Sequence, residues 1–117
     1  MVRIKKLDKR GGLRVKTKKP TAQFLLLEAI WNLVGGPSAV AEAIGEIVQA
    51  PANWRLRGRV PLEKVMKVAN ALGISPWGLN YDGYSAVVHP YPTWEEVVNS
   101  YGLPAKTVKA ILKARSK

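Results

Sequence analysis

Side chains that can hydrogen-bond to the edges of nucleic-acid bases are concentrated in one short segment, residues 49–59. The segment reads Gln-Ala-Pro-Ala-Asn-Trp-Arg-Leu-Arg-Gly-Arg. Arginine can donate hydrogen bonds to O6 and N7 of guanine, and asparagine or glutamine can pair with N6 and N7 of adenine. The side chains of these types are Gln49, Asn53, Arg55, Arg57 and Arg59. Their chemistry indicates contact with nucleic acid, through bases or, for Arg59, through backbone phosphate.

The charge of the chain favours a polyanionic partner. Lys and Arg number 19 against 8 Asp and Glu, which gives a formal net charge of +11 and a pI near 10.2. Nine of the basic residues lie in residues 1–20, and others are concentrated in residues 54–67 and 104–117. A field of this sign attracts nucleic acid, whereas the alternative is a well-solvated surface without such a partner. The further basic side chains expected to contact DNA are Arg3, Lys5, Arg14, Lys16, Lys64, Lys106 and Lys109.

Two short helices are predicted to position the segment. The first starts at Pro37 or Ser38 and ends at Gly45, where a positive φ angle suits glycine. If Gly45 is the ninth position of a helix-turn-helix, the positions that face the partner helix hold small or apolar residues. These residues are Val40, Ala41 and Ile44, with Trp54 at the eighteenth position. The pattern predicts a helix-turn-helix, a unit that places its second helix in the DNA major groove.

Two residues depart from the helix-turn-helix pattern. Glu46 occupies the tenth position, where an apolar residue is expected, and we expect Ile47 to take that place. Pro51 lies where the second helix should be continuous. Because proline fits best in the first turn of a helix, we expect this helix to start late, at residue 49 or 50, and to run to about residue 57.

Further helices are predicted on both sides of this unit. Thr21 is a suitable N-cap for a first helix that ends at a glycine pair. Pro61 starts a helix that Gly73 ends, and residues 75–79 are typical of one more helical turn. Residues 21–80 are therefore expected to form an all-α, helix-turn-helix bundle of about five helices.

Residues 1–20 allow two interpretations. Apolar and basic residues alternate at positions 2–5 and 13–16, with turn residues between them. This pattern is typical of a two-stranded β-ribbon with one basic face. The alternative is a basic arm that becomes ordered on nucleic acid. In both cases the expected role is contact with phosphate.

Residues 81–92 are predicted to be a linker. They are rich in Tyr and Pro, and a short strand is predicted at residues 85–89. His89 is the single histidine of the chain and has no second histidine, cysteine or carboxylate beside it. We therefore expect His89 to be a loop residue rather than a metal ligand or a general base.

A helical hairpin is predicted over residues 93–117. Thr93 and Glu96 have the spacing of a capping box, which marks the start of its first helix. Gly102 has the place of a second helix-turn-helix glycine, with Lys106 and Lys109 near the outer side of the following helix. The alternatives are a second unit that contacts DNA and a plain hairpin that packs on the body or pairs two subunits.

Three sequence elements resemble a known family. They are Gly-Gly-x-Ser-Ala-x-Ala-x-Ala-Ile-Gly at residues 35–45, Asn-Trp-x-x-Arg-Gly-Arg-Val-Pro at 53–61 and Ala-Leu-Gly-Ile-Ser-Pro at 71–76. They make residues 22–80 similar to the Cro and YdaS-like branch of phage and prophage helix-turn-helix regulators. The resemblance implies a small α-helical DNA-binding protein, often dimeric on palindromic operators, whose DNA contacts come from the segment 49–59.

The principal hypothesis is a sequence-specific DNA-binding transcriptional regulator of phage or mobile-element type, such as a repressor. Its partner would be double-stranded DNA, and further partners would be a second copy of the chain, RNA polymerase or a phage protein. The alternatives are a phage packaging or replication accessory with the same fold and a non-specific nucleic-acid binder, RNA included.

Other classes of protein lack support in the residues. The chain has no cysteine and one histidine, and no phosphate-binding loop of the Walker or Rossmann type occurs in it. We therefore expect no enzymatic activity, no cofactor and no metal site. No run of about 18 apolar residues could cross a membrane, and no apolar signal core follows the basic start. These features predict a cytoplasmic protein associated with the nucleoid.

Overall fold

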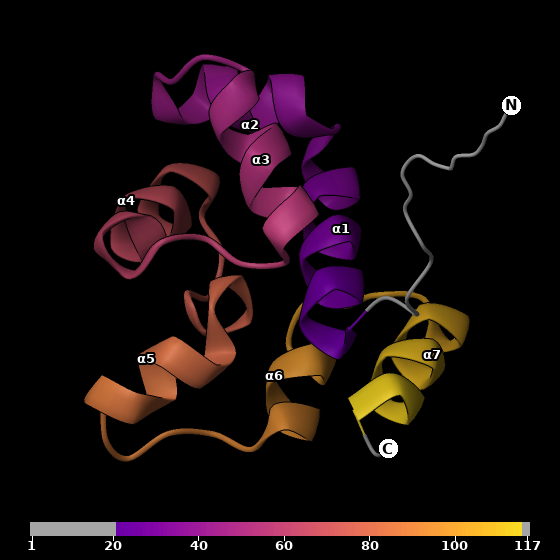
Figure 1. Ribbon diagram of the computed structural model, residues 1–117. Helices are drawn as coiled ribbons and strands as arrows, with labels where there is room; N and C mark the ends of the chain where they lie inside the picture. Colours follow the sequence, from indigo (N-terminus) through magenta and orange to yellow (C-terminus); the bar gives the residue numbers. More distant parts are fainter. Residues whose placement is uncertain (1–20, 116–117) are drawn as a thin grey trace, which may run out of the picture.

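Residues 21–115, which the computed structural model describes, fold into helices joined by short turns, and no strand occurs among them (Figure 1). The all-α class predicted from the sequence is confirmed for this part of the chain. The predicted arm or ribbon, with Arg3, Lys5, Arg14 and Lys16, lies outside the described residues. The elements are α1 (Ala22–Val34), α2 (Pro37–Ile44), α3 (Gln49–Arg57), α4 (Leu62–Leu72), the 3-10 turn η1 (Trp77–Leu79), α5 (Tyr81–Val87), α6 (Trp94–Asn99) and α7 (Ala105–Arg115).

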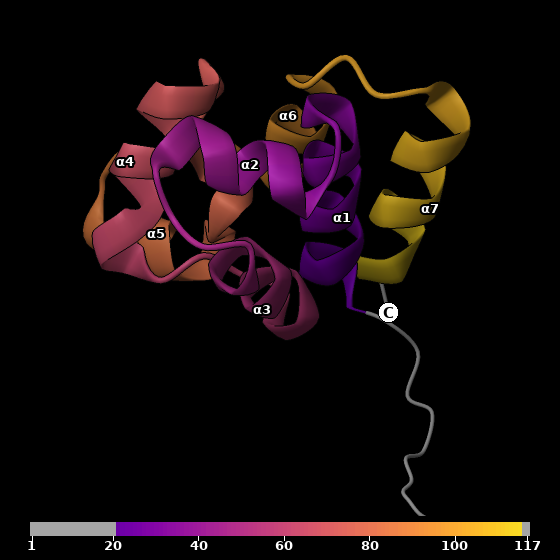
Figure 2. The same ribbon diagram turned by 90° about the horizontal axis from the view of Figure 1, so that it is seen from above.

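Helix α1 is the central element of the fold. Its apolar side chains Leu26, Leu27, Ile30 and Trp31 are completely buried. Helices α2 and α3 pack on one side of α1, and α7 packs on the other (Figures 1 and 2). One hydrophobic core therefore joins residues from α1 through to α7.

The ends of several helices coincide with the capping residues expected from the sequence. Thr21 Oγ1 accepts a hydrogen bond from Phe24 N at 3.1 Å and caps α1. Thr93 N donates to Glu96 Oε1 at 2.9 Å and Glu96 N donates to Thr93 Oγ1 at 3.2 Å, so the capping box of α6 is complete. Gly45 ends α2 with a φ angle of 72°. These local predictions are confirmed.

Helix α3 begins late, as the proline predicted. It starts at Gln49, so that Pro51 lies in its first turn, where a missing backbone N–H breaks no helical hydrogen bond. Pro51 is buried, and its carbonyl oxygen accepts a hydrogen bond from Trp31 Nε1 at 2.9 Å. The proline therefore sets the start of α3, and Trp31 fixes that start to α1.

The prediction of a linker with a short strand was wrong, because Tyr81–Val87 form helix α5. Asn80 Oδ1 accepts a hydrogen bond from Gly83 N at 3.1 Å and caps this helix. Tyr81 is buried, and the ring of Tyr84 packs edge-on against Trp77 with centroids 4.7 Å apart. The tyrosines that suggested a linker hold this short helix in place. Tyr84 packs on η1, and the ring of Tyr81 packs against Trp94 of α6 with centroids 5.3 Å apart. His89 lies exposed beyond the end of α5.

Helices α6 and α7 pack on the body of the molecule. Val97, Val98 and Ile111 belong to the same core as the buried side of α1. Tyr101 Oη donates to Ser75 O at 2.6 Å and accepts from Gly78 N at 2.9 Å, which ties the α6–α7 connection to η1. Packing on the body, one of the alternatives for this hairpin, is therefore what its contacts show.

Candidate nucleic-acid interface

Helix α3 lies at the edge of the molecule, with one side packed on the body and the other open to solvent (Figure 2). Pro51 and Trp54 form its buried side. The exposed residues of the helix are Gln49, Asn53, Leu56 and Arg57, and Ala52 and Arg55 are half-buried. The structure thus brings most of the predicted base-contacting side chains to the outer side of one helix.

The turn between α2 and α3 differs from the prediction. Ile47 was expected to replace the apolar contact that Glu46 lacks, but the Ile47 side chain is 69% exposed. Glu46 N donates to Ala41 O at 3.0 Å, and the chain leaves the end of α2 in a direction that keeps the next residue in solvent. Val48 is also exposed, so that an apolar pair lies in solvent beside the start of α3.

Glu46 connects this turn to α4 through two lysines. Its Oε2 atom lies 3.1 Å from Lys67 Nζ and 3.3 Å from Lys64 Nζ. Hydrogen bonds from Lys67 and Lys64 hold the pKa of Glu46 below its ordinary value of 4.5. Lys64, which the sequence assigns to phosphate contact, therefore has a carboxylate partner within the protein. At the tenth motif position, Glu46 therefore forms ion pairs with two lysines of α4, where the sequence predicted an apolar contact.

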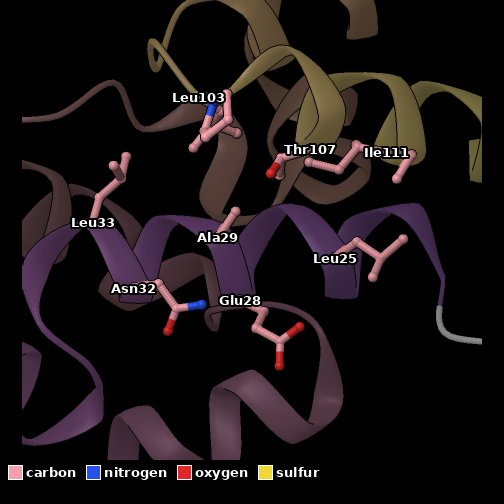
Figure 3. Close-up of a pocket in the computed structure, with 10 residues that line it drawn as sticks. Leu25, Glu28, Ala29, Asn32, Leu33, Leu103, Thr107 and Ile111 are labelled. Atoms are coloured by element: carbon pink, nitrogen blue, oxygen red, sulfur yellow. The ribbon is translucent and has the colours of Figure 1, made fainter.

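At least two pockets lie on the described part of the chain. One lies between α1 and α7 and has a volume of about 390 Å³. Figure 3 shows Leu25 and Ala29 of α1 facing Thr107 and Ile111 of α7 across it. Glu28 is the one ionisable residue among those that line this pocket. A largely apolar lining with a single carboxylate does not suit phosphate, so this pocket does not belong to the candidate interface.

A second pocket, which we call the arginine pocket, brings together Arg57, Arg59 and Arg115. It has a volume of about 760 Å³ and lies between the start of α1, the α3–α4 connection, α5 and the end of α7. Thr21 and Gln23 at the start of α1 also line it, and the first turn of a helix adds a partial positive charge. The arginine pocket is therefore a cationic concavity directly beyond the C-terminal end of α3.

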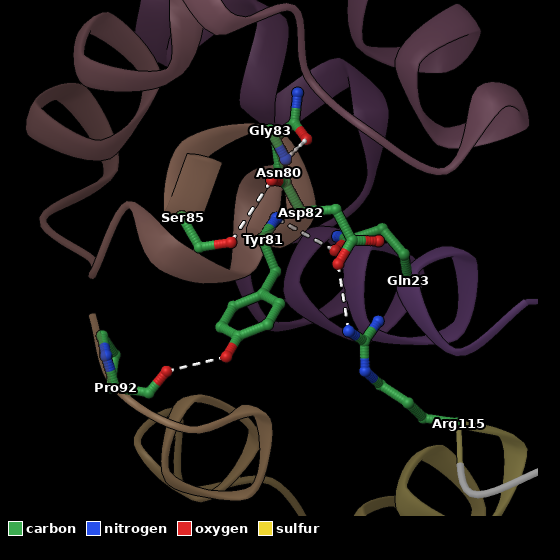
Figure 4. A network of polar contacts seen from close by, with 8 residues as sticks. All are labelled: Gln23, Asn80, Tyr81, Asp82, Gly83, Ser85, Pro92 and Arg115. Atoms are coloured by element: carbon green, nitrogen blue, oxygen red, sulfur yellow. Dashed lines mark hydrogen bonds and ion pairs between the residues drawn. The ribbon is translucent and has the colours of Figure 1, made fainter. Parts of the chain in front are cut away.

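Arg115 is held in place by α5 and α6. Its Nη2 atom lies 3.0 Å from Asp82 Oδ1 (Figure 4). Its guanidinium lies over the rings of Trp94 at 4.8 Å and Tyr81 at 5.2 Å. An ion pair this exposed stabilises the fold little, but with two aromatic rings it fixes the direction of the side chain. Burial raises the pKa of Tyr81, and the charge of Arg115 opposes that effect.

Two amide side chains support the arginine pocket from inside the fold. Gln23 Nε2 donates to Gly78 O at 2.7 Å. Gln23 Oε1 accepts from Tyr81 N at 3.2 Å (Figure 4). Asn80 Nδ2 donates to Val60 O at 2.9 Å and so holds the α3–α4 connection. Sequence reasoning missed these contacts. An asparagine immediately before a helix was the one local sign of them, since asparagine is a favoured N-cap.

The basic residues of α7 do not all converge on this site. The first turns of α7 lie on the far side of α1 from α3, whereas the last turn reaches the arginine pocket (Figure 2). Lys106 and Lys109, both exposed, belong to those first turns. The candidate interface therefore consists of the outer side of α3 and the arginine pocket, and these two lysines lie away from it.

Residues 21–115 contain neither a cluster of metal ligands nor a single helix suited to cross a membrane. No group of three or more His, Cys, Asp or Glu residues is placed there to hold a metal ion. No single helix in that range is long and apolar enough to cross a membrane. Helices α1 and α2 reach that length and composition only when taken together, and they meet at an angle of 73°.

Comparisons of the chain with models of protein families, with curated proteins and with solved structures find no match. The resemblance to Cro and YdaS-like regulators therefore rests on the motif residues of this chain. The function has to be inferred from the chemistry and geometry of the site.

Proposed function

We propose that this chain is a sequence-specific DNA-binding transcriptional regulator of the phage or mobile-element type. In this proposal α2 and α3 act as a helix-turn-helix, and α3 enters the major groove of double-stranded DNA. The observation that carries the proposal is the exposed row of amide side chains on α3, directly beside the arginine pocket. Sequence-specific binding needs groups that contact bases and groups that contact phosphates, and these two kinds of group are neighbours here.

The dimensions of α3 agree with this role. A helix of 9 residues is about 13 Å long, and its diameter with side chains, about 10–12 Å, matches a major groove about 12 Å wide. Such a short helix contacts few base pairs. Much of the affinity must therefore come from phosphate contacts.

The arginine pocket supplies phosphate contacts at one end of α3. Arg57 and Arg59 are exposed at its mouth, and Arg115 is already oriented by Asp82 and Trp94. Each neutralised phosphate releases counterions, so the logarithm of the binding constant should fall by about 0.9 per contact for each decade of salt. Binding through this surface is therefore expected to depend steeply on ionic strength.

Competition binding tests the proposal. A labelled duplex selected by the full chain from a random pool is displaced with unlabelled selected or random duplex at physiological salt. We expect the selected duplex to compete at least about 10³-fold better. Equal competition by both duplexes would contradict a sequence-specific regulator. A palindrome with half-sites about 34–36 Å apart would identify a dimer as the bound form.

A non-specific nucleic-acid binder is the second candidate function, because nine of the 19 basic residues precede residue 21. The two functions differ in how they respond to deletion of residues 1–19. In the regulator, the deletion should weaken selected and random duplexes alike and leave their ratio unchanged. A non-specific binder should bind the selected and the random duplex with equal affinity, both before and after the deletion.

A further inference from the structure

We infer that α3 recognises A·T base pairs, with Gln49 and Asn53 hydrogen-bonding to adenine and Ala52 and Leu56 contacting the methyl group of thymine. This inference rests on the proposed function and goes further, because it names the base composition of the target. It is carried by the arrangement of amide, apolar and basic side chains around the exposed half of the helix.

The four residues form the central stripe of the exposed side. They lie at intervals of three, four and seven residues, which places them on one side of a helix. Gln49 and Asn53 are exposed, Leu56 is 71% exposed, and Ala52 is half-buried beside them. Three of the four residues are therefore open to solvent, and Leu56 has the largest exposed fraction of any large apolar residue in residues 21–115.

The arginines of the helix lie outside the stripe. At 100° per residue, Arg55 and Arg57 project to opposite flanks of the line through Gln49 and Leu56. Arg57 lines the arginine pocket, and Arg55 is half-buried. Side chains on the flanks of a helix in the major groove meet the two phosphate strands, whereas side chains on the central stripe meet the bases.

The chemistry of the central stripe matches an A·T pair. Adenine presents N7 and N6 to an amide side chain, and thymine presents its methyl group to an apolar one. Guanine is usually recognised by arginine or lysine, and the stripe contains neither. An exposed leucine on a DNA-contacting surface also makes its best apolar contact with the thymine methyl group, the one apolar group in the major groove.

The spacing along the helix sets the spacing of the bases. Gln49 and Asn53 are about 6 Å apart along the axis, at a rise of about 1.5 Å per residue. Base pairs are stacked about 3.4 Å apart. Because a helix in the major groove is inclined to the DNA axis, the two amides should contact adenines no more than about two base pairs apart. Leu56, about one turn beyond Asn53, should reach a thymine methyl group in the same stretch.

Modified bases test the inference with the full chain and a duplex selected by it. Replacing thymine with deoxyuridine removes only the methyl group, and it should weaken binding about fourfold at the site that Leu56 contacts. Replacing adenine with 7-deazaadenine removes only N7, and it should weaken binding about tenfold at the sites of the amides. Both changes leave the phosphate backbone intact.

Protein variants connect each base to its side chain. In Leu56→Ala the penalty for deoxyuridine should disappear, and in Gln49→Ala or Asn53→Ala one 7-deazaadenine penalty should disappear. Asn70→Ala is the matched control, because Asn70 is an exposed asparagine on α4, outside the candidate interface. It should leave both penalties unchanged. The side chains of the four substituted residues, Gln49, Asn53, Leu56 and Asn70, are exposed, so circular dichroism should show that each variant keeps the fold.

The outcomes separate this inference from the proposed function. A selected consensus with G·C pairs at the protected positions, or no effect of the modified bases, overturns the A·T inference and leaves a sequence-specific regulator. No consensus and equal competition by random duplex overturn both. If Leu56→Ala changes the oligomeric state and not the deoxyuridine penalty, the leucine serves a protein contact and the inference is wrong.

Discussion

Gly78 and Tyr101 are a pair of residues that position η1 against the α6–α7 connection. A Cβ atom at position 78 would lie 2.5 Å from Tyr101 Oη and 2.6 Å from Cε2 of the same ring. The hydroxyl also bonds to Gly78 N and to Ser75 O. Tyr101 can therefore approach the backbone of η1 this closely because Gly78 has no side chain.

Gly78→Ala should lower the free energy of unfolding by about 1–3 kcal/mol, because the tyrosine ring must move out of a packed position. Urea denaturation measures this cost. In a Tyr101→Ala background the same substitution should cost much less, since the two changes affect one contact. An equal cost in both backgrounds would show that the close approach is not the cause.

Glu46 gives a prediction for the dependence of stability on pH. Its pKa is lowered in the folded state by Lys67 and Lys64, so its stabilising effect is present above its ordinary pKa of 4.5 and is lost as the pH falls through the folded value. Glu46→Gln should therefore have a slightly lower Tm than the parent chain near neutral pH, and the difference in Tm should be smaller at about pH 3. Thermal unfolding followed at both pH values measures the difference.

The effect of salt tests whether the ion pairs of Glu46 cause this difference in Tm. The ion pairs of Glu46 are partly exposed, and salt screens such pairs. The difference in Tm between the two chains should shrink as salt is added at neutral pH. A difference that persists at low pH and in high salt would point to a change in packing of the α2–α3 turn instead.

At the scale of elements, α5 is held through its N-cap. Asn80 is 8% exposed and uses both ends of its amide, one to cap α5 and one to bond Val60 O, which lies just before α4. Val60 N in turn donates to Leu79 O at 2.9 Å. The segments before α4 and α5 are therefore joined by hydrogen bonds in both directions.

Asn80→Ala should cost about 2–3 kcal/mol of folding free energy, because it removes a cap and leaves a buried carbonyl group without its donor. Asn99→Ala is the control, since Asn99 is exposed and donates only to Glu95 O within its own helix. Its cost should be below about 0.5 kcal/mol. Chemical denaturation of the two variants measures both values, and equal costs would contradict a structural role for Asn80.

At the scale of the whole molecule, the fold gathers cationic groups from distant parts of the chain on the side that α3 occupies. The arginine pocket combines the start of α1, the end of α3 and the end of α7. The first turns of α7, with two of its lysines, lie on the other side of α1 (Figure 2). The arginines of the pocket and these two lysines therefore lie on different sides of α1, and only the arginines belong to the candidate interface.

The double variant Arg57→Ala, Arg59→Ala should weaken selected and random duplexes by a similar factor and reduce the slope of binding against salt by about two phosphate contacts. The double variant Lys106→Ala, Lys109→Ala is the matched control, because it also removes two positive charges, on the far side of α1. It should leave the salt slope unchanged. Titrations at several salt concentrations measure the slopes, and a larger loss for the selected duplex would show that these arginines read bases.

The sequence by itself determined the features that depend on neighbouring residues. Thr21 and Gly45 mark helix ends through hydrogen bonds or backbone angles that involve only the next few residues, and the Thr93–Glu96 box does the same. Pro51 predicted the late start of α3 for a similar reason, since the missing N–H is tolerated only in a first turn. The inward position of Trp54 on α3 followed from the spacing of the helix-turn-helix pattern.

Only the tertiary structure decided which distant residues meet. Arg115 and Asp82 are 33 positions apart, Gln23 and Tyr81 are 58 apart, and the lysine partners of Glu46 lie on another helix. Neither periodicity nor local spacing in the sequence predicts such pairs, because they depend on how the fold brings distant helices together. Helix α5 was not predicted for the same reason. It is so short that its stability depends on the packing of Tyr81 rather than on helix propensity.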